Sequence, residues 1–566
     1  MVKIKYILNI FSLILIAVCF QNCGGFESQY VENTSLSQEG SNLSPPTDDQ
    51  LSFTKKRGTT KVQKSKLRLL SGPEFVNSIE HITNYKIKKE LNFTGVSSGF
   101  KTGDNLLLET NVLNVFMTEA ENAANNYLDN EALNHFTCLK DEFKQSCYDQ
   151  VIKVFTERSY RRPATAQELA GLNKLYIKIN ADLNNRKESL KLVLKRVLLS
   201  HQFLYKSEIG NLKTSSGTKL DPYEVASFIS YSLTGSPPDT QLYNLAKSNQ
   251  LNSVNIKRHV SRILSTDKSK NWLNQFFRDW LRLNELSNMK ENPEAYTKFS
   301  NKEMPTLLNQ EFDLFINKIV FDGNGTTVDL LTTNKTFANS DTGYLYQNDV
   351  STNKLVEIEQ GDNRSGVLTL ASFLSSHSSR VDKETDKPVS RGVLIQNQIL
   401  CEEVGFPTGL NLAATEDNIK AEHPDFDSYT VRRKFELGMN QSATCTHCHS
   451  QFMPYGYLSS NFNALGEYKV LQNERPIISK ASPTIGGKSY DFNKISELSL
   501  KLANSRQYQH CFSEKLGIFL FGNTDETVDG QLSWLVYDHH NSSGGVIKQM
   551  IEKTLSDFRI YQRRRN

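Results

Sequence analysis

The stretch LKLVLKRVLLSHQFL, residues 190–204, decides the fold class. Its apolar positions 190, 193, 194, 197 and 198 recur at the spacing of one face of an α-helix. Residues 223–233 repeat that spacing, and the Pro237-Pro238-Asp239 that follows ends one helix and offers Asp239 as the cap of the next. Because each apolar face needs a covering surface, the sequence predicts a mainly α protein built by helix-on-helix packing.

Other regions extend this pattern or interrupt it. NWLNQFFRDWLRL, residues 271–283, predicts a strongly aromatic helix, in which we interpret Trp272, Phe276 and Trp280 as core residues rather than a binding surface. Apolar segments at 498–502 and 512–521 predict further helices. Between 323 and 365, Gly, Thr and Asn become frequent, which predicts a loop-rich connection.

Length and charge restrict the class of protein. A chain of 566 residues is too long for one hydrophobic core, and its 31 Phe and 22 Tyr are ample for several cores. The net charge of +4 is spread along the chain and creates no coherent positive field. We therefore expect several globular domains and no nucleic-acid partner.

The first residues predict export from the cell. Lys3 and Lys5 precede an apolar run that is too short to span a membrane comfortably and that ends just before Cys23-Gly24. This arrangement resembles the lipobox of bacterial lipoproteins, so residues 1–22 are interpreted as a signal peptide and Cys23 as the lipidated residue. A plain signal peptide followed by a stray cysteine is the alternative. Residues 23–66, polar and without periodicity, predict a disordered tether.

This reading places the protein in the bacterial cell envelope. A lipidated N-terminus bearing several acyl chains is enough for stable attachment to a membrane. Gly24 offers no acidic cue for retention at the inner membrane, so we expect the outer membrane rather than the inner one.

The cysteines divide into pairs. Of eight, Cys19 is lost with the signal peptide and Cys23 is lipidated, which leaves six in an oxidising compartment. Cys138 and Cys147 are close in sequence and are expected to form a local disulfide, and Cys401 and Cys511 would form the long-range one. Cys445 and Cys448 are then left for chemistry.

Residues 445–449, CTHCH, have the C-x-x-C-H spacing of c-type haem attachment. Two thiols one helical turn apart can reach both vinyl groups of one porphyrin, and the next imidazole then faces the iron. We expect one covalent haem c at Cys445 and Cys448, with His449 as proximal iron ligand and His447 facing solvent.

Three other readings of the motif remain open. Zinc could bind Cys445 and Cys448 together with Cys401 and Cys511, although the second closely spaced pair of a structural zinc site is missing. A thioredoxin-like redox pair would need a flanking strand, which the sequence does not indicate. A simple disulfide would explain the two thiols but not the adjacent His449.

The distal iron ligand is predicted from a stripe of residues that precedes the CTHCH motif. Val431, Phe435 and Met439 recur every four residues and could cover the far face of the haem, which makes Met439 the candidate ligand. Met453 follows His449 by four residues and is expected on the same face of the haem as His449. Other methionines would reach the iron only through long-range folding: Met289, Met304 and Met550. A Met/His pair favours electron transfer, whereas an open position favours ligand binding or catalysis.

Long ordered segments resemble a known family, the multidomain cytochrome c-like lipoproteins first noted in planctomycetes, built from a series of domains of unknown function. The resemblance covers most of residues 67–560. It rests on these segments: RSYRRPATAQEL from Arg158, LDPYEVASFISYSLTGSPPDTQL from Leu220, RSGVLTLASFLSSHSS from Arg364, KPVSRGVLIQNQILC ending at Cys401, CTHCHSQFMPYGYLSSNFNALGEYK from Cys445, the helix around Trp280 and the region around Cys511. The resemblance implies an exported haem protein and no particular substrate.

The chain departs from the family pattern near the motif. Met453 stands where the family usually has Asp before Pro-x-Gly, and Ser460 and Asn463 replace later acidic residues. Met439 takes the place of a family His six residues before the first haem cysteine. An activity that depends on those carboxylates is therefore not expected here, whereas the exchange at Met439 is what a changed but retained iron ligand would look like.

These readings give a domain plan and a ranking of functions. Behind the tether we expect helical domains at 67–155, 156–208 and 209–340, a loop-rich cytochrome c-like haem domain at 341–475 and a helical domain at 480–566. The leading hypothesis is electron transfer between the anchored haem and a redox partner protein that the sequence does not identify. The alternatives are a haem enzyme of peroxidase or oxidase type and a non-redox surface lipoprotein.

Overall fold

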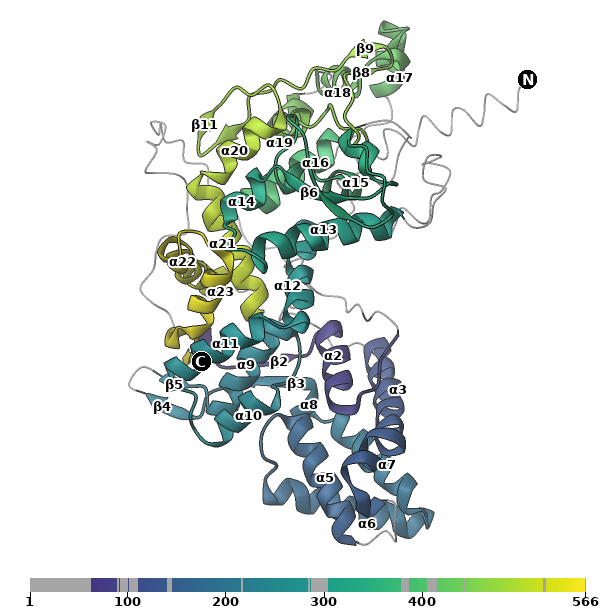
Figure 1. The fold of residues 1–566 in the computed structure, drawn as a ribbon, viewed down its shortest axis with the longest axis vertical. Coiled ribbons are helices and arrows are strands. Elements are labelled where there is room, and N and C mark those ends of the chain that lie inside the picture. The colour runs from purple at the N-terminus through teal and green to yellow at the C-terminus, as the bar shows by residue number, and fades with distance from the viewer. Residues whose placement is uncertain are drawn as a thin grey trace, which may run out of the picture. The chain divides into compact units, whose positions relative to one another are not determined.

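The structure, a computed structural model, is mainly α, as predicted (Figure 1). It describes residues 63–88, 91, 100, 110–139, 145–214, 217–283, 286, 304–377, 386–404, 415–440, 443–522 and 526–564. The predicted signal peptide, Cys23, the tether up to residue 62 and Met289 lie outside the described residues. Within the described part of the chain, every helix is either too short or too polar to cross a membrane.

The chain forms two compact units, each assembled from separate stretches of sequence. Unit 1 contains residues 277–513 and 540–548, and unit 2 contains residues 57–276, 514–539 and 549–566. The predicted C-terminal domain at 480–566 is therefore shared between the two units. Helical periodicity identifies an apolar face but not the segment that covers it. The sequence therefore predicts the helices of residues 480–566 as one domain, although they belong to two units.

Unit 2 consists of helices and short strands. Its helices are α2 (Gly72–Thr83), α3 (Thr110–Asn126), α4 (Ala132–His135), α5 (Gln145–Tyr160), α6 (Ala166–Leu183), α7 (Arg186–Leu198), α8 (His201–Leu204), α9 (Pro222–Thr234), α10 (Thr240–Lys247), α11 (Ser253–Leu264), most of α12 (Asp267–Trp280), the second half of α21 (Arg506–Phe521), most of α22 (Glu526–Ser542) and most of α23 (Ile547–Ser556). Its strands are β1 (Gln63–Lys64), β2 (Lys66–Leu69), β3 (Tyr205–Glu208), β4 (Leu212–Thr214), β5 (Gly217–Lys219) and β12 (Gln562–Arg564).

The helical predictions in unit 2 are confirmed. The five apolar positions of residues 190–198 lie in α7 and are fully buried. Helix α9 ends at Gly235 in the left-handed conformation, and the Asp239 side chain caps α10 by accepting from the backbone N–H of Leu242. Trp272 and Phe276 of α12 are buried core residues, as predicted. The predicted domains 67–155 and 156–208, however, share one core that includes Phe75, Val151 and Val193.

Strands join parts of unit 2 that are far apart in sequence. A four-stranded sheet has the order β1-β12-β5-β4, in which β1 runs parallel to β12 with Gln63 opposite Arg563. Strand β2 pairs antiparallel with β3, with Lys66 opposite Glu208. The predicted tether therefore ends before residue 63 rather than at 66. The sequence missed these strands because they are two to four residues long and because most of their partners are remote in sequence.

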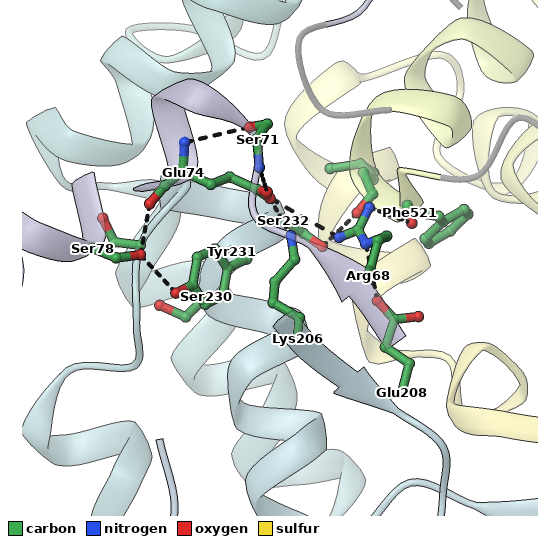
Figure 2. A network of polar contacts seen from close by, with 12 residues as sticks. Arg68, Ser71, Glu74, Ser78, Lys206, Glu208, Ser230, Tyr231, Ser232 and Phe521 are labelled. Atoms are coloured by element: carbon green, nitrogen blue, oxygen red, sulfur yellow. Dashed lines mark hydrogen bonds and ion pairs between the residues drawn. The ribbon is translucent and has the colours of Figure 1, made fainter. Parts of the chain in front are cut away.

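Buried charges connect these strands. Glu74 of α2 and Glu208 of β3 are each 2% exposed and contact the cations of β2, β3 and β12. Arg68 Nε lies 3.3 Å from Glu208 Oε1, Arg563 Nη2 lies 3.0 Å from Glu208 Oε2, and Lys206 forms an ion pair with Glu74. Figure 2 shows Arg68 between the two carboxylates, with Lys206 directed at Glu74. Burial alone would raise the pKa of Glu208, but Arg68 and Arg563 hold it at about 2.

Unit 1 carries the CTHCH segment. Its helices are the end of α12, α13 (Met304–Val320), α14 (Thr327–Thr332), α15 (Ala371–Ser376), α16 (Pro388–Leu394), α17 (Thr415–Glu422), α18 (Val431–Asn440), α19 (Ala443–Tyr457), α20 (Ile495–Ala503) and the first half of α21 (Arg506–Phe521). Its strands form three hairpins: β6 (Lys335–Ala338) with β7 (Val356–Glu359), β8 (Leu471–Gln472) with β9 (Arg475–Pro476), and β10 (Thr484–Ile485) with β11 (Lys488–Ser489). The region predicted as loop-rich, 323–365, thus contains α14 and the β6–β7 hairpin.

Substitution of Glu74 by Gln tests the buried charge cluster. Gln retains the shape of Glu and its ability to accept the Ser71 backbone N–H in the helix cap, so the change removes mainly the charge. We expect a loss of about 3 kcal/mol in the free energy of unfolding, because Lys206 is left buried without its counter-ion. Denaturant unfolding measures the loss. Glu80→Gln on the same helix, where the pair with Lys86 is exposed, should cost less than about 1 kcal/mol; equal losses would contradict the explanation.

Candidate functional site

The CTHCH segment lies in the first turns of α19. Cys445, Cys448 and His449 are three and four residues apart, so they share one face of this helix. Both cysteines are partly exposed, His449 is 8% exposed, and His447 is exposed as predicted. A helix therefore presents two sulfurs and one imidazole side by side, at the edge of the protein surface.

The six cysteines that the structure describes form two disulfides, with the pairing that the sequence predicts. Cys138 is joined to Cys147, and Cys401 is joined to Cys511. Cys445 and Cys448 take part in neither bond and are not bonded to each other. The four-cysteine zinc reading fails on this point, because Cys401 and Cys511 have no thiolates to donate. The simple-disulfide reading also loses support.

The surroundings of the motif are helical. Helix α18 precedes α19, with residues 441–442 between them, and no described strand leads into the motif. A thioredoxin-like pair sits at a strand-to-helix turn, so this setting does not support that reading. The haem segment was predicted to be loop-rich, but at the motif it forms the long helix α19.

His449 is enclosed by aromatic rings. The Phe452 ring centroid lies 5.1 Å from that of His449, and the Phe435 centroid of α18 lies 6.4 Å away. Burial lowers the pKa of His449, which favours the neutral imidazole that can bind a metal. Burial and the nearby Cys445 raise the pKa of the Cys448 thiol.

Helix α18 lies along the start of α19. The Thr446 hydroxyl donates to the carbonyl oxygen of Met439 at 2.8 Å, and the Gln472 side chain accepts from the backbone N–H of Val431 at 2.8 Å. Met439 is partly exposed and lies beside the motif. Met453 is buried one turn beyond His449 on α19 itself, and Met304 and Met550 are buried in the cores of units 1 and 2.

Three family models match the chain in the order in which the sequence resemblance places them. They are PSD5 (protein of unknown function, DUF1595) at residues 147–208, PSD4 (protein of unknown function, DUF1592) at 220–347 and PSCyt3 (protein of unknown function, DUF1588) at 364–472. Together they match more than half of the chain. The chain belongs to the planctomycete cytochrome c-like multidomain family.

Within this cytochrome c-like family, the PSCyt3 match contains α16, α18, α19 and the whole motif. No curated protein and no solved structure matches the chain. The likeness of the region around Cys511 to the family's C-terminal domain stays a prediction.

The residues present fit the haem that the family name suggests. Two sulfurs outside the disulfides and a neutral imidazole share one helix face, and the rings of Phe435 and Phe452 supply apolar contact around the imidazole. Among the described residues, no group of three or more His, Cys, Asp and Glu is arranged to hold a metal ion by itself. Two sulfurs and one imidazole are the groups that attachment of a c-type haem uses.

The departures from the family pattern have structural consequences. Asn463, which replaces an acidic residue, is buried and accepts from the backbone N–H groups of Leu465 at 2.9 Å and Glu467 at 3.0 Å. It thus holds a turn after α19. Ser460 is buried in the same region, and Met453 packs inside the unit.

Sequence reasoning missed the residues behind the motif. Phe452 contacts His449, and α16 packs closely on α19 through Gly392. The stretch 387–401 was noted only as part of the family resemblance. The Gly392 position was a usable signal, because a glycine inside a helix often marks a close approach of another backbone.

Thiol labelling tests the assignment of the six cysteines. In protein made without haem-attachment machinery, a maleimide added without reductant should label Cys445 and Cys448 but not the other four cysteines between residues 138 and 511, because those four sulfurs are in disulfides. Peptide mass mapping before and after reduction measures this. Labelling of Cys401 or Cys511 before reduction would contradict the pairing and reopen the zinc reading.

Proposed function

We propose that the protein carries one covalent haem c and transfers electrons while anchored to a membrane of the bacterial cell envelope. The observation that supports this most is the pair Cys445 and Cys448, the two described cysteines outside disulfides, on one helix face with His449. Membership of a cytochrome c-like family supports the same function.

Each residue of the motif has a distinct role in this proposal. Cys445 and Cys448 form the thioether bonds, and His449 is the proximal iron ligand. Bound haem supplies one-electron chemistry at its iron. The rings of Phe435 and Phe452 exclude water from the imidazole and restrict its rotation.

The anchor and the partner are further parts of the proposal. Cys23 is the lipidated residue, and the tether that follows it attaches the body to the membrane, with the outer membrane favoured. The exchange partner is another redox protein, and nucleic acid is not a partner, since the charge is small and dispersed.

The double change Cys445→Ser, Cys448→Ser tests the haem assignment. In a host with haem-attachment machinery, the wild-type protein should show covalent haem staining and one haem per chain by pyridine haemochrome and intact mass. The double variant should lose covalent haem completely, because no sulfur remains to bond the porphyrin. His447→Ala, at an exposed position of the same turn, should keep it. Staining that persists in the double variant would refute the assignment.

Met439 is the proposed distal ligand, and Met439→Leu tests it. Loss of the thioether should convert a low-spin, six-coordinate spectrum to a high-spin one and lower the reduction potential, because Met/His ligation raises it. Optical spectroscopy and redox titration measure both effects. Met453→Leu is the matched control, since that side chain is buried on the proximal helix.

Two outcomes would redirect this part of the proposal. If Met439→Leu leaves the low-spin spectrum unchanged, Met439 is not the ligand. If the wild-type protein is already high-spin and its spectrum shifts with peroxide, the haem enzyme alternative replaces electron transfer.

A further inference from the structure

Helices α16 and α19 approach so closely that two glycines are needed at their contact (Figure 1). A Cβ on Gly392 of α16 would overlap the carbonyl oxygen of Phe452 and lie 3.2 Å from the backbone nitrogen of Gly456. A Cβ on Gly456 of α19 would overlap the carbonyl oxygen of Pro388. Backbone therefore packs directly on backbone, in a place where a rigid peptide group cannot move aside as a side-chain tip would.

The contact reaches the motif through one residue. Gly392 lies against the peptide group of Phe452, and the ring of Phe452 lies 5.1 Å from the imidazole of His449. Phe452 is 1% exposed, so its ring has little freedom to adjust. A displacement of the α19 backbone at Phe452 is therefore passed on to His449.

Arg391, the neighbour of Gly392, holds the other end of α19. Its guanidinium is fully buried and donates to the carbonyl oxygens of Phe462 and Asn463 at 2.8 Å each. It also donates to Ser459 O at 3.2 Å and to Leu374 O at 3.3 Å. Three of these carbonyls belong to residues 459–463, in the turn that follows the end of α19 at Tyr457, so Arg391 holds this turn in place.

A second arginine secures the same turn independently of α16. Arg364 donates to the carbonyl oxygens of Gly466 and Leu345, and its guanidinium lies 4.6 Å from the ring centroid of Phe462. The turn after α19 is thus fixed to the body of unit 1 from two sides. The helix can neither slide nor rotate without breaking these bonds.

We propose that Gly392 of α16 positions His449 through the backbone and ring of Phe452, and that Arg391 supports this by holding the turn that follows α19. The inference rests on the proposed function, because it concerns the imidazole as an iron ligand. Helix α16 then determines the position of the His449 imidazole, and this position determines how strongly His449 interacts with the iron.

The variant Gly392→Ala tests the inference in the full-length haem protein. The added methyl group must displace the Phe452 peptide, so covalent haem should be kept while the reduction potential shifts and the high-spin fraction rises several-fold. Gly438→Ala is the matched control, because a Cβ there meets nothing within 4 Å although it lies on α18. Phe452→Leu, which removes the ring but keeps an apolar side chain, should shift the potential and the spectrum as well. Arg391→Lys, which keeps the charge but loses the forked geometry, should do so more weakly.

The outcomes separate the two proposals. A wild-type protein without covalent haem would overturn the proposed function and this inference together. A wild-type haem protein whose Gly392→Ala and Phe452→Leu variants keep their potential and spectrum, even at a lower melting temperature, would overturn the inference alone. If Gly392→Ala does not fold, Arg391→Lys decides by the same two readouts, because it leaves the contact between the Phe452 ring and His449 in place.

Discussion

Burial of one-sided helices is the constraint on which this structure depends. Most of the long helices have one apolar face, and that face is often covered by segments that are distant in sequence. Unit 2 takes residues from both ends of the chain, and unit 1 takes residues 540–548 from beyond its main segment. Apolar faces alone would still allow the helices to slide along one another. In unit 2, pairing of the strands is further restricted by a buried cluster of charges: Glu74, Lys206, Arg68, Glu208 and Arg563.

The six described cysteines fall into two groups, four that form disulfides and two that do not. Cys511 is fully buried and ties α21 to the end of the 387–401 stretch through Cys401. Cys445 and Cys448 stay at the surface of α19. Four sulfurs thus stabilise the fold and two remain accessible for covalent chemistry. The disulfide at Cys401 also restrains the stretch that contains α16, so one covalent bond lies close in sequence to the contact behind the motif.

The sequence predicts what is local and misses what is remote. The periodicity of residues 190–198, the cap at Asp239 and the spacing of CTHCH are each readable within about ten residues, and the structure has helices and caps where they were expected. The pairing of Gln63 with Arg563 could not be predicted from the local sequence, because each strand is too short to show an alternating apolar pattern. The contact of Gly392 with Phe452 was missed for a related reason. A glycine in a helix indicates that another segment packs closely there, but it does not identify that segment.

The parallel pairing of β1 with β12 has a consequence for the geometry of attachment. Residues 63–64 are the first described residues after the tether, and they lie beside residues 563–564. If the tether is lipidated as proposed, β12 lies beside the point where the tether joins the folded body. A reporter protein fused behind β12 would then share that attachment point, whereas one inserted in a loop of unit 2 away from this sheet would not.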